Sequence, residues 1–218
     1  MGYFRELPNL QYQSPYTSRI SSSTYVTAKN IFRRMKIRDD LKNVFSVFNK
    51  YEIDDGDRPD TVARDIYGKS NLDWVVLITA NIINVRDEWP LSDKELYDFT
   101  VSKYGLTEIN NVKHYETKEI KNSRGVVILP SGNIVSTGFS VSYYDGKNIT
   151  TTPSETIRGV TNYEYEVREN QKKRSIDILR SEYLQQFLND IRKEMTYNRS
   201  SQYINDKLIR TENTRVTN

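Results

Sequence analysis

The densest apolar segment of this chain lies between Tyr51 and Tyr104, and it constrains the fold more than any other stretch. Around it the chain is polar, because its 218 residues are 36% hydrophobic and 28% charged and its mean hydropathy is -0.72. Such a chain buries only modest cores of its own and can complete them against partner proteins. The segment offers no catalytic group, so the sequence favours a docking module over an enzyme.

Turn and cap residues divide this segment into a strand near Tyr51, two short helices and a closing loop. Gly56 permits a positive φ in the first turn, Asp57 is a candidate cap for the first helix, and Pro59 fits the first turn of that helix. Gly68 is well placed to end the helix.

The second helix is apolar nearly all round from residue 72 to 78, so it should be central to the core. Ser70 or Asn71 can cap it, and the Asn81 side chain is placed to tie the closing loop to the backbone. Farther along, Ser92–Glu95 form a capping box that predicts a third helix.

Between residues 112 and 152 the pattern changes to strands. Residues 126–129, a Pro-Ser-Gly-Asn turn and residues 134–135 predict a hairpin. Residues 139–143 alternate in polarity, and Asp145-Gly146 is a strong turn signal before the next strand. We therefore expect an antiparallel meander of three or four strands.

The C-terminal part predicts a helix over residues 162–174, a short strand over 175–179 and a second helix that Ser181 can cap. Apolar residues form a helical stripe in that second helix, and they are Leu184, Phe187, Leu188, Ile191 and Met195. Residues 1–28 look like an extended arm that is ordered only if something holds it, and the tail after Tyr197 is expected to be mobile.

The charge pattern excludes several classes of partner. The 32 basic and 29 acidic residues are mostly interspersed, so we expect no nucleic-acid partner. A basic cluster near residues 29–42 suggests a solvated face or contact with an acidic protein surface, and its members are Lys29, Arg33, Arg34, Lys36, Arg38 and Lys42. A strand over residues 44–48 should follow this cluster. No apolar run approaches the ~18 residues that span a membrane, so no membrane contact is expected.

The residue types that catalysis or metal binding would need are scarce. Cysteine is absent, which excludes disulfides and thiolate metal sites. His114 is the only histidine, and Asp54, Asp55 and Asp57 do not have the spacing of a calcium loop. We therefore expect no enzyme, no metal site and no cofactor.

The segment from Tyr51 to Ile83 resembles a LysM module, a strand-helix-helix-strand fold that often binds polymers containing N-acetylglucosamine. The residues that carry this resemblance are Tyr51, Ile53, Gly56-Asp57, Val62-Ala63, Ile66-Tyr67-Gly68, Trp74 and Asn81-Ile82. A LysM-type protein that binds peptidoglycan is accordingly an alternative function, and a hydrolase built on scattered carboxylates is a second one.

A longer match resembles the baseplate wedge proteins of T-even-type contractile-tail phages, the family of gene-fifty-three products. Three ordered blocks carry it, and they are Asn30-Ile31-Phe32-Arg33, Arg58-Pro59-Asp60 through Trp74-Val75, and Tyr163-Glu164 through Asp190. The resemblance implies a structural subunit in the tail baseplate of the virion, assembled in the host cytoplasm.

In that family the subunit contains a LysM-like fold, clamps the helical core bundle of the wedge and helps join six wedges into a ring. The implied partners are the heterodimer-forming wedge proteins, the sheath initiator and neighbouring wedges, with six copies per baseplate. The resemblance carries over no catalytic residue.

These expectations give an α+β fold with five parts. An N-terminal arm (1–50) precedes the LysM-like module with its following helix (51–105), a β-rich insertion (106–160), a helix-strand-helix part (161–197) and a polar tail (198–218). We expect the module core and the C-terminal helix to contact partners through Arg58, Asp60, Tyr67, Trp74, Phe187 and Ile191.

Overall fold

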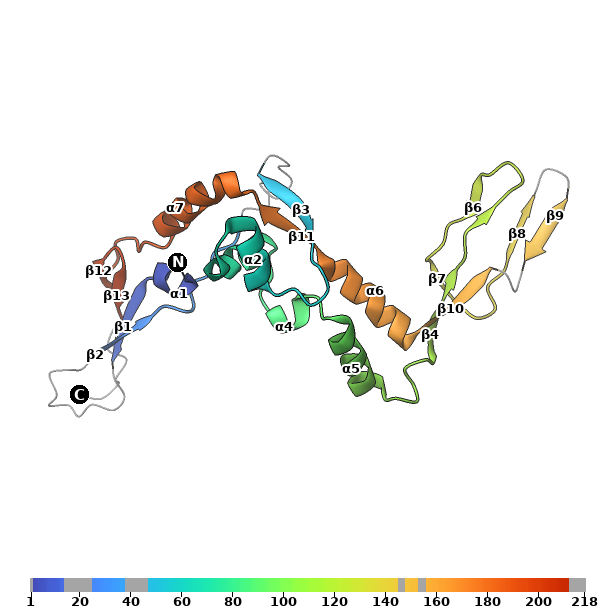
Figure 1. Ribbon diagram of the computed structural model, residues 1–218, viewed down its shortest axis with the longest axis horizontal. Helices are drawn as coiled ribbons and strands as arrows, with labels where there is room; N and C mark the ends of the chain where they lie inside the picture. Colours follow the sequence, from blue (N-terminus) through green and yellow to red (C-terminus); the bar gives the residue numbers. More distant parts are fainter. Residues whose placement is uncertain (1, 14–24, 38–46, 145–147, 153–155, 212–218) are drawn as a thin grey trace. The chain divides into compact units, whose positions relative to one another are not determined.

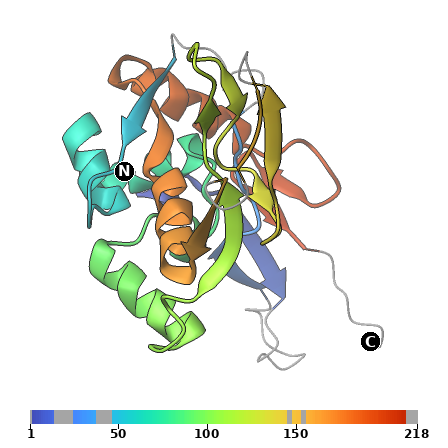
Figure 2. The same cartoon turned by 90° about the vertical axis from the view of Figure 1, so that its right-hand side faces the viewer.

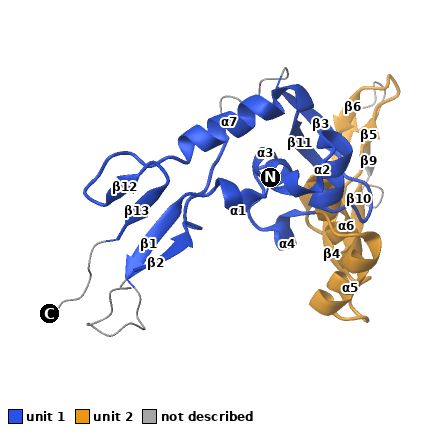
Figure 3. Cartoon of the chain, turned by 60° about the vertical axis from the view of Figure 1, so that its left-hand side comes forward, with its two compact units in different colours: residues 1–89, 175–218 blue, residues 90–174 orange. Residues whose placement is uncertain are grey.

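The computed structural model describes residues 2–13, 25–37, 47–144, 148–152 and 156–211. The chain combines helices with several small sheets, and runs of helices follow runs of strands, which confirms the predicted α+β class (Figure 1). The chain forms two compact units, one of Met1–Trp89 with Ser175–Asn218 and the other of Pro90–Arg174 (Figure 3). Parts of the predicted basic cluster and of the strand before Phe48 fall in residues 38–46, outside the described residues.

The core of the first unit combines a strand pair with three helices. Strand β3 (Phe48–Glu52) pairs antiparallel with β11 (Ser175–Leu179). Helices α2 (Pro59–Tyr67) and α3 (Asp73–Thr79) follow β3, and α7 (Leu184–Glu194) follows β11. The LysM-like module is not confirmed, because the strand that pairs with β3 comes from the C-terminal part of the chain rather than from the segment after α3.

Helix α2 begins and ends where its sequence predicts. Pro59 is its first residue, Gly68 adopts φ 72°, and the Gly68 N–H donates to the carbonyl of Arg64. The predicted cap Asp57 is wrong, because the N-cap is Arg58 and makes no side-chain cap bond. The Asp57 carbonyl instead accepts from the indole N–H of Trp89 at 2.8 Å.

Helix α3 lies at the centre of this core, as predicted. Trp74, Val75 and Val76 are at most 5% exposed. The short 3-10 helix η1 (Ser70–Leu72) leads directly into α3, so Leu72 occupies the N-cap position with no side-chain cap bond. The predicted caps Ser70 and Asn71 therefore do not act as caps of α3.

The end of α3 is a Schellman motif. The N–H of Ile82 donates to the carbonyl of Leu77 at 2.8 Å, and the N–H of Asn81 donates to that of Ile78 at 3.1 Å. Asn81 has φ 58°, the left-handed conformation that Asn tolerates better than most residues. Asn81 thus closes the loop through its backbone conformation, whereas the sequence suggested its side-chain amide.

Helix α7 buries the predicted stripe. Ile191 and Met195 are at most 3% exposed, and Leu184, Phe187 and Leu188 pack against the same core. Ser181 begins the 3-10 helix η2 (Ser181–Tyr183) rather than capping α7, whose N-cap is Tyr183. The predicted cap was misplaced because a 3-10 turn precedes the α-helix.

A second sheet of this unit joins the two ends of the chain in the order β12-β13-β1-β2. It follows the short helix α1 (Tyr3–Glu6), and its strands are β1 (Asn9–Gln13), β2 (Tyr25–Lys29), β12 (Tyr203–Asn205) and β13 (Leu208–Arg210). Strand β1 pairs parallel with β13 and antiparallel with β2. Strand β1 of the N-terminal arm is therefore held on both sides, and the described part of the tail that was predicted to be mobile contains two paired strands.

The second unit packs two helices and a small sheet. Helix α5 (Asp93–Tyr104) packs against α6 (Asn162–Arg174), and α6 contacts β4 (Val112–Thr117) and β10 (Ile157–Thr161) (Figure 2). Both bonds of the Ser92–Glu95 capping box are present, as predicted. The short helix α4 (Val85–Glu88), which the sequence did not predict, belongs to the first unit.

The predicted meander is wrong. Strand β4 lies between β10 and β7 (Ile134–Val135), while β6 (Val127–Leu129) pairs with β5 (Ile120–Lys121). Thr117 explains why residues 126–135 do not form a hairpin, because its hydroxyl donates to the Pro130 carbonyl at 2.7 Å and accepts from the Asn133 N–H at 3.1 Å.

The last strand pair of this unit fits the sequence. Strands β8 (Val141–Tyr144) and β9 (Ile149–Thr152) pair antiparallel, whereas their predicted turn at residues 145–146 lies outside the described part of the chain. Among the helices of the described residues, none combines the length and apolar character that crossing a membrane requires.

Candidate protein-docking site

Four of the six residues expected to contact partners belong to the core of the first unit. Trp74 is 5% exposed and Ile191 is 2% exposed, so both act in packing. The half-buried Phe187 stacks on Trp74 with 6.5 Å between ring centroids. The Tyr67 hydroxyl donates to the Leu179 carbonyl at 2.9 Å, and burial raises the Tyr67 pKa so that this donor stays protonated.

The other two expected residues are exposed at the start of α2. Arg58 Nε lies 3.3 Å from Asp60 Oδ1, and their side chains are 79% and 49% exposed. An ion pair this exposed adds little to folding stability. Both side chains are consequently free to exchange their mutual contact for one with a partner.

A groove of about 670 Å³ lies along α7. Met35, Ile37, Val47 and Phe48 line it from the N-terminal half of the chain, and Phe187 and Ile191 line it from α7. Ile78 and Leu179 complete the apolar part of the lining. The groove therefore brings Phe187 and Ile191, two of the expected contact residues, to the edge of a concave apolar surface.

Charged residues of opposite sign also line the groove. Arg34 and Lys36 come from the segment of residues 34–37, and Asp190 and Glu194 lie one turn apart on α7. Residues four apart on a helix share one face, so the two carboxylates form an acidic strip along the groove. The groove can therefore discriminate between partners by the charges that flank their apolar face.

Arg33 fixes the basic segment beside the end of α7. Its two terminal nitrogens donate to the carbonyl oxygens of Thr196 at 3.0 Å and of Glu194 at 3.1 Å. Its guanidinium also lies over the Tyr197 ring, 5.1 Å from the centroid. These contacts tie the chain just before Arg34 to the end of α7, so they fix two of the segments that line the groove relative to each other.

The sequence anticipated one side of this groove and missed the other. Asp190 and Glu194 stand beside the apolar stripe of Phe187 and Ile191, a spacing that the sequence already contains. The approach of residues 34–37 to α7 spans about three-quarters of the chain, and local periodicity carries no signal for such a contact.

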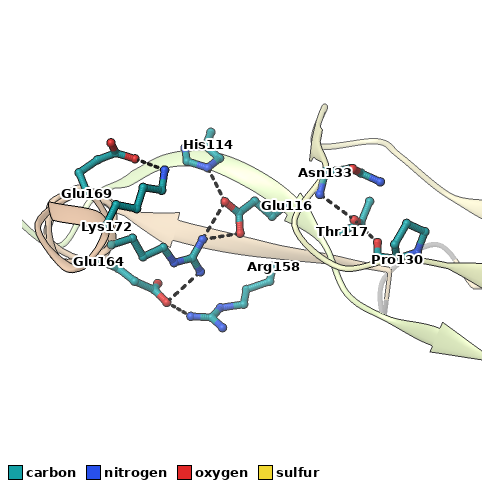
Figure 4. A network of polar contacts seen from close by, with 10 residues as sticks. His114, Glu116, Thr117, Pro130, Asn133, Arg158, Glu164, Glu169 and Lys172 are labelled. Carbon is teal, nitrogen blue, oxygen red and sulfur yellow. Dashed lines mark hydrogen bonds and ion pairs between the residues drawn. The ribbon is translucent and has the colours of Figure 1, made fainter. Parts of the chain in front are cut away.

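The second unit holds a polar network that ties α6 to the sheet (Figure 4). Arg168 on α6 donates to Glu116 on β4 at 2.6 Å and to Glu164 at 3.3 Å. His114 Nε2 lies 2.9 Å from Glu116, and Arg158 of β10 pairs with Glu164. Hydrogen bonds from Arg168 and then His114 lower the pKa of Glu116, so this carboxylate is a charged structural group.

A buried carboxylate, Glu166, serves the contact between α5 and α6. Glu166 accepts hydrogen bonds from Lys103 at 2.8 Å and from the Tyr104 hydroxyl at 2.7 Å. Burial by itself raises the Glu166 pKa, whereas the hydrogen bonds from Lys103 and Tyr104 lower it. The lowering effects together outweigh burial, so the Glu166 pKa lies below its ordinary value. Within the described residues, no three His, Cys, Asp or Glu side chains come together as a metal site would need.

The apolar groove with charged rims, the exposed ion pair and the purely structural carboxylates are typical of a protein that docks onto other proteins. Residues 9–131 match the family of base plate wedge protein 53. Since this range covers more than half of the 218 residues, the chain belongs to this family of phage baseplate wedge proteins. No curated protein matches the chain.

Family membership confirms the predicted resemblance to the baseplate wedge proteins. The matched range contains the blocks at Asn30–Arg33 and Arg58–Val75, while the third block, from Tyr163 onward, lies beyond it. The chain is thus a structural component of the phage tail baseplate that interacts with other baseplate components. This structural role favours a non-enzymatic function and gives no support to the glycan-binding alternative.

Proposed function

We propose that this chain clamps the helical core of the baseplate wedge and helps join six wedges into a ring. The partners would be the heterodimer-forming wedge proteins and the sheath initiator, together with neighbouring wedges. The observation that carries the proposal is the groove along α7, which combines an apolar lining with charged rims of opposite sign.

An amphipathic helix is the partner element that fits this groove best. Helix-in-groove recognition places apolar residues at helical spacing onto an apolar surface, here the partly exposed Met35, Val47 and Phe187. An acidic flank of that helix would face Arg34, and a basic flank would face Asp190. This complementarity would fix the orientation of the helix as well as its affinity.

Arg58 and Asp60 form a second proposed contact, at the N-terminus of α2. Their side chains need no folding role, because the pair is largely solvent-exposed. A partner that offers one carboxylate and one cation could replace the internal ion pair by two intermolecular ones. This second point of contact would turn a single docked helix into a clamp.

Charge reversal at both contacts tests the proposal. The probe is a wedge subassembly purified from cells that express the other wedge proteins of the same phage without this chain. Asp190→Lys and Arg58→Glu should each weaken binding of the full chain by about tenfold or more, since each replaces an attraction by a repulsion. Biolayer interferometry would measure the affinities.

Two charge reversals outside the contacts serve as matched controls. Glu182→Lys changes an exposed acid just before α7, and Lys69→Glu changes an exposed cation just after α2. Both controls should bind within about twofold of the natural chain. If Asp190→Lys binds as tightly as its control, the groove is not a contact surface for the wedge. If Arg58→Glu binds as tightly as its control, the start of α2 is not one either.

A further inference from the structure

Two large apolar side chains, Ile31 and Phe32, are exposed to solvent in the turn that follows β2. Phe32 is 88% exposed and Ile31 is 64% exposed. Phe32 is the most exposed of the large apolar side chains in the described part of the chain. A scattered exposed apolar residue is ordinary, so its neighbours decide whether it has a role.

The residues that flank this pair are held firmly. The Asn30 N–H donates to the Pro8 carbonyl at 2.9 Å, and the Asn30 amide donates to the Tyr197 hydroxyl at 2.9 Å. The Asn30 side-chain oxygen accepts from the Phe32 N–H at 3.2 Å. On the other side, Arg33 donates to two carbonyl oxygens at the end of α7.

This anchoring matters because ordering a loop on binding costs free energy. The turn is fixed before any partner arrives, so Ile31 and Phe32 can enter a partner pocket without that cost. Aromatic side chains, Phe among them, are enriched at the buried centres of protein interfaces.

The charge around the turn indicates what kind of pocket would accept it. Arg33, Arg34 and Lys36 follow the apolar pair directly, and no acidic residue lies between Lys29 and Lys36. A protein pocket with an apolar floor and an acidic rim complements this arrangement. Interface charges of opposite sign also steer encounter and exclude basic partners.

We propose that Ile31 and Phe32 form an apolar anchor that inserts into an acidic-rimmed apolar pocket on another baseplate protein. The inference rests on the proposed function, because it presumes that the chain binds its wedge partners. It adds a third contact to the two already proposed. Ile31 and Phe32 come directly before Arg33 in the sequence, whereas the groove segment 34–37 comes directly after it.

Serine substitutions test the anchor directly. Phe32→Ser should weaken binding to the purified wedge subassembly by at least about tenfold, and Ile31→Ser by a smaller factor. Ile83→Ser is the matched control, because Ile83 lies in the same unit and is 65% exposed. It should change the affinity by less than about twofold, and none of the three should lower the melting temperature.

The outcomes separate the two proposals. If the natural chain fails to bind the subassembly, the proposed function fails. If the natural chain binds and Phe32→Ser binds equally well, only the anchor fails. Arg33→Lys keeps the charge but cannot reproduce the paired donation to the α7 carbonyls, so it should lower affinity while Phe32 is intact.

Photo-crosslinking identifies the pocket itself. Full chain carrying p-benzoylphenylalanine at position 32 would be assembled into baseplates, irradiated and digested for mass spectrometry. The anchor predicts adducts on apolar residues of another baseplate protein with Asp or Glu nearby. Adducts to a second copy of this chain, or binding of the free chain to anionic lipid vesicles that Phe32→Ser abolishes, would contradict the proposed pocket.

Discussion

At the scale of single residues, Trp74 connects three parts of the first unit. Its ring lies 5.7 Å from that of Tyr3 and 6.5 Å from that of Phe187, measured between centroids. Tyr3 belongs to α1 and Phe187 to α7, so one side chain of α3 links segments from both ends of the chain. The groove along α7 depends on this packing, because Phe187 forms part of the groove lining.

Replacing Trp74 should therefore destabilise the first unit strongly. Trp74→Ala should cost about 3–5 kcal/mol of unfolding free energy, through lost burial and the cavity left behind. Denaturant unfolding followed by circular dichroism measures this cost. Leu106→Ala, at a side chain that is 66% exposed, is the control and should cost little. A loss below about 1 kcal/mol for Trp74→Ala would show that the ring is not part of the core.

Glu116 links charge to stability in the second unit. Its pKa is lower in the folded chain than its ordinary value of 4.5, chiefly because Arg168 donates to it. A carboxyl with a lowered folded pKa stabilises the fold above its unfolded pKa, and this contribution is lost as the pH falls through the folded value.

Glu116→Gln should then be less stable than the natural chain at neutral pH, and the gap in unfolding free energy should narrow as the pH falls below the ordinary carboxyl pKa of 4.5. The reason is that protonation removes from Glu116 the charge that Gln already lacks. Denaturation midpoints of both chains across this pH range provide the test. A gap that stays constant with pH would mean that Arg168 does not hold the Glu116 charge.

At the scale of elements, the two ends of the chain meet in one sheet. The Asn9 N–H donates to the Lys207 carbonyl at 2.7 Å, and the Thr211 N–H donates to the Gln11 carbonyl at 2.8 Å. Strand β1 therefore has a partner on the side that faces away from β2. Without β13, that side of β1 would be an open edge.

Truncation after residue 200 removes β12 and β13 and should expose this edge. We expect the Asn9 amide to exchange with solvent much faster, because its acceptor is gone, while the amides of α5 keep their protection. Hydrogen exchange followed by mass spectrometry or NMR compares the two chains. Unchanged protection at Asn9 would contradict the pairing of β1 with β13.

The sequence predicted elements better than their partners. The Gly68 stop, the capping box at Ser92 and the α7 stripe were readable because caps and periodicity report on local geometry. The pairing of β3 with β11 could not be predicted, because more than a hundred residues separate these strands. The sequence pattern of a strand does not indicate which other strand it pairs with. The hairpin expected over residues 126–135 failed because Thr117, which lies outside that segment, forms hydrogen bonds to Pro130 and Asn133 in its turn.

In the candidate site, too, the local features could be predicted from the sequence and the long-range contacts could not. Phe187 and Ile191 were expected contact residues, and they do line the groove, but only together with residues 34–37. Trp74 was also expected at a partner surface, whereas its burial assigns it to packing. An aromatic residue in an apolar helix fits a core and an interface equally well, so sequence alone could not separate the two.

At the scale of the whole molecule, the first unit is discontinuous. The chain leaves it after Trp89, builds the second unit, and returns at Ser175 to supply β11 and α7. The groove therefore needs both ends of the chain, and it forms only after the second unit has been traversed. This organisation suits a subunit whose docking surface should be complete only in the finished chain.

The most direct test of the account is an affinity pull-down of the tagged full chain from phage-infected cells. Mass spectrometry and sedimentation would then define the complex that is recovered. We expect stoichiometric wedge proteins in a complex of the size of a wedge or a six-fold ring. Recovery of the chain alone, or with cell-wall fragments in place of wedge proteins, would contradict the clamp.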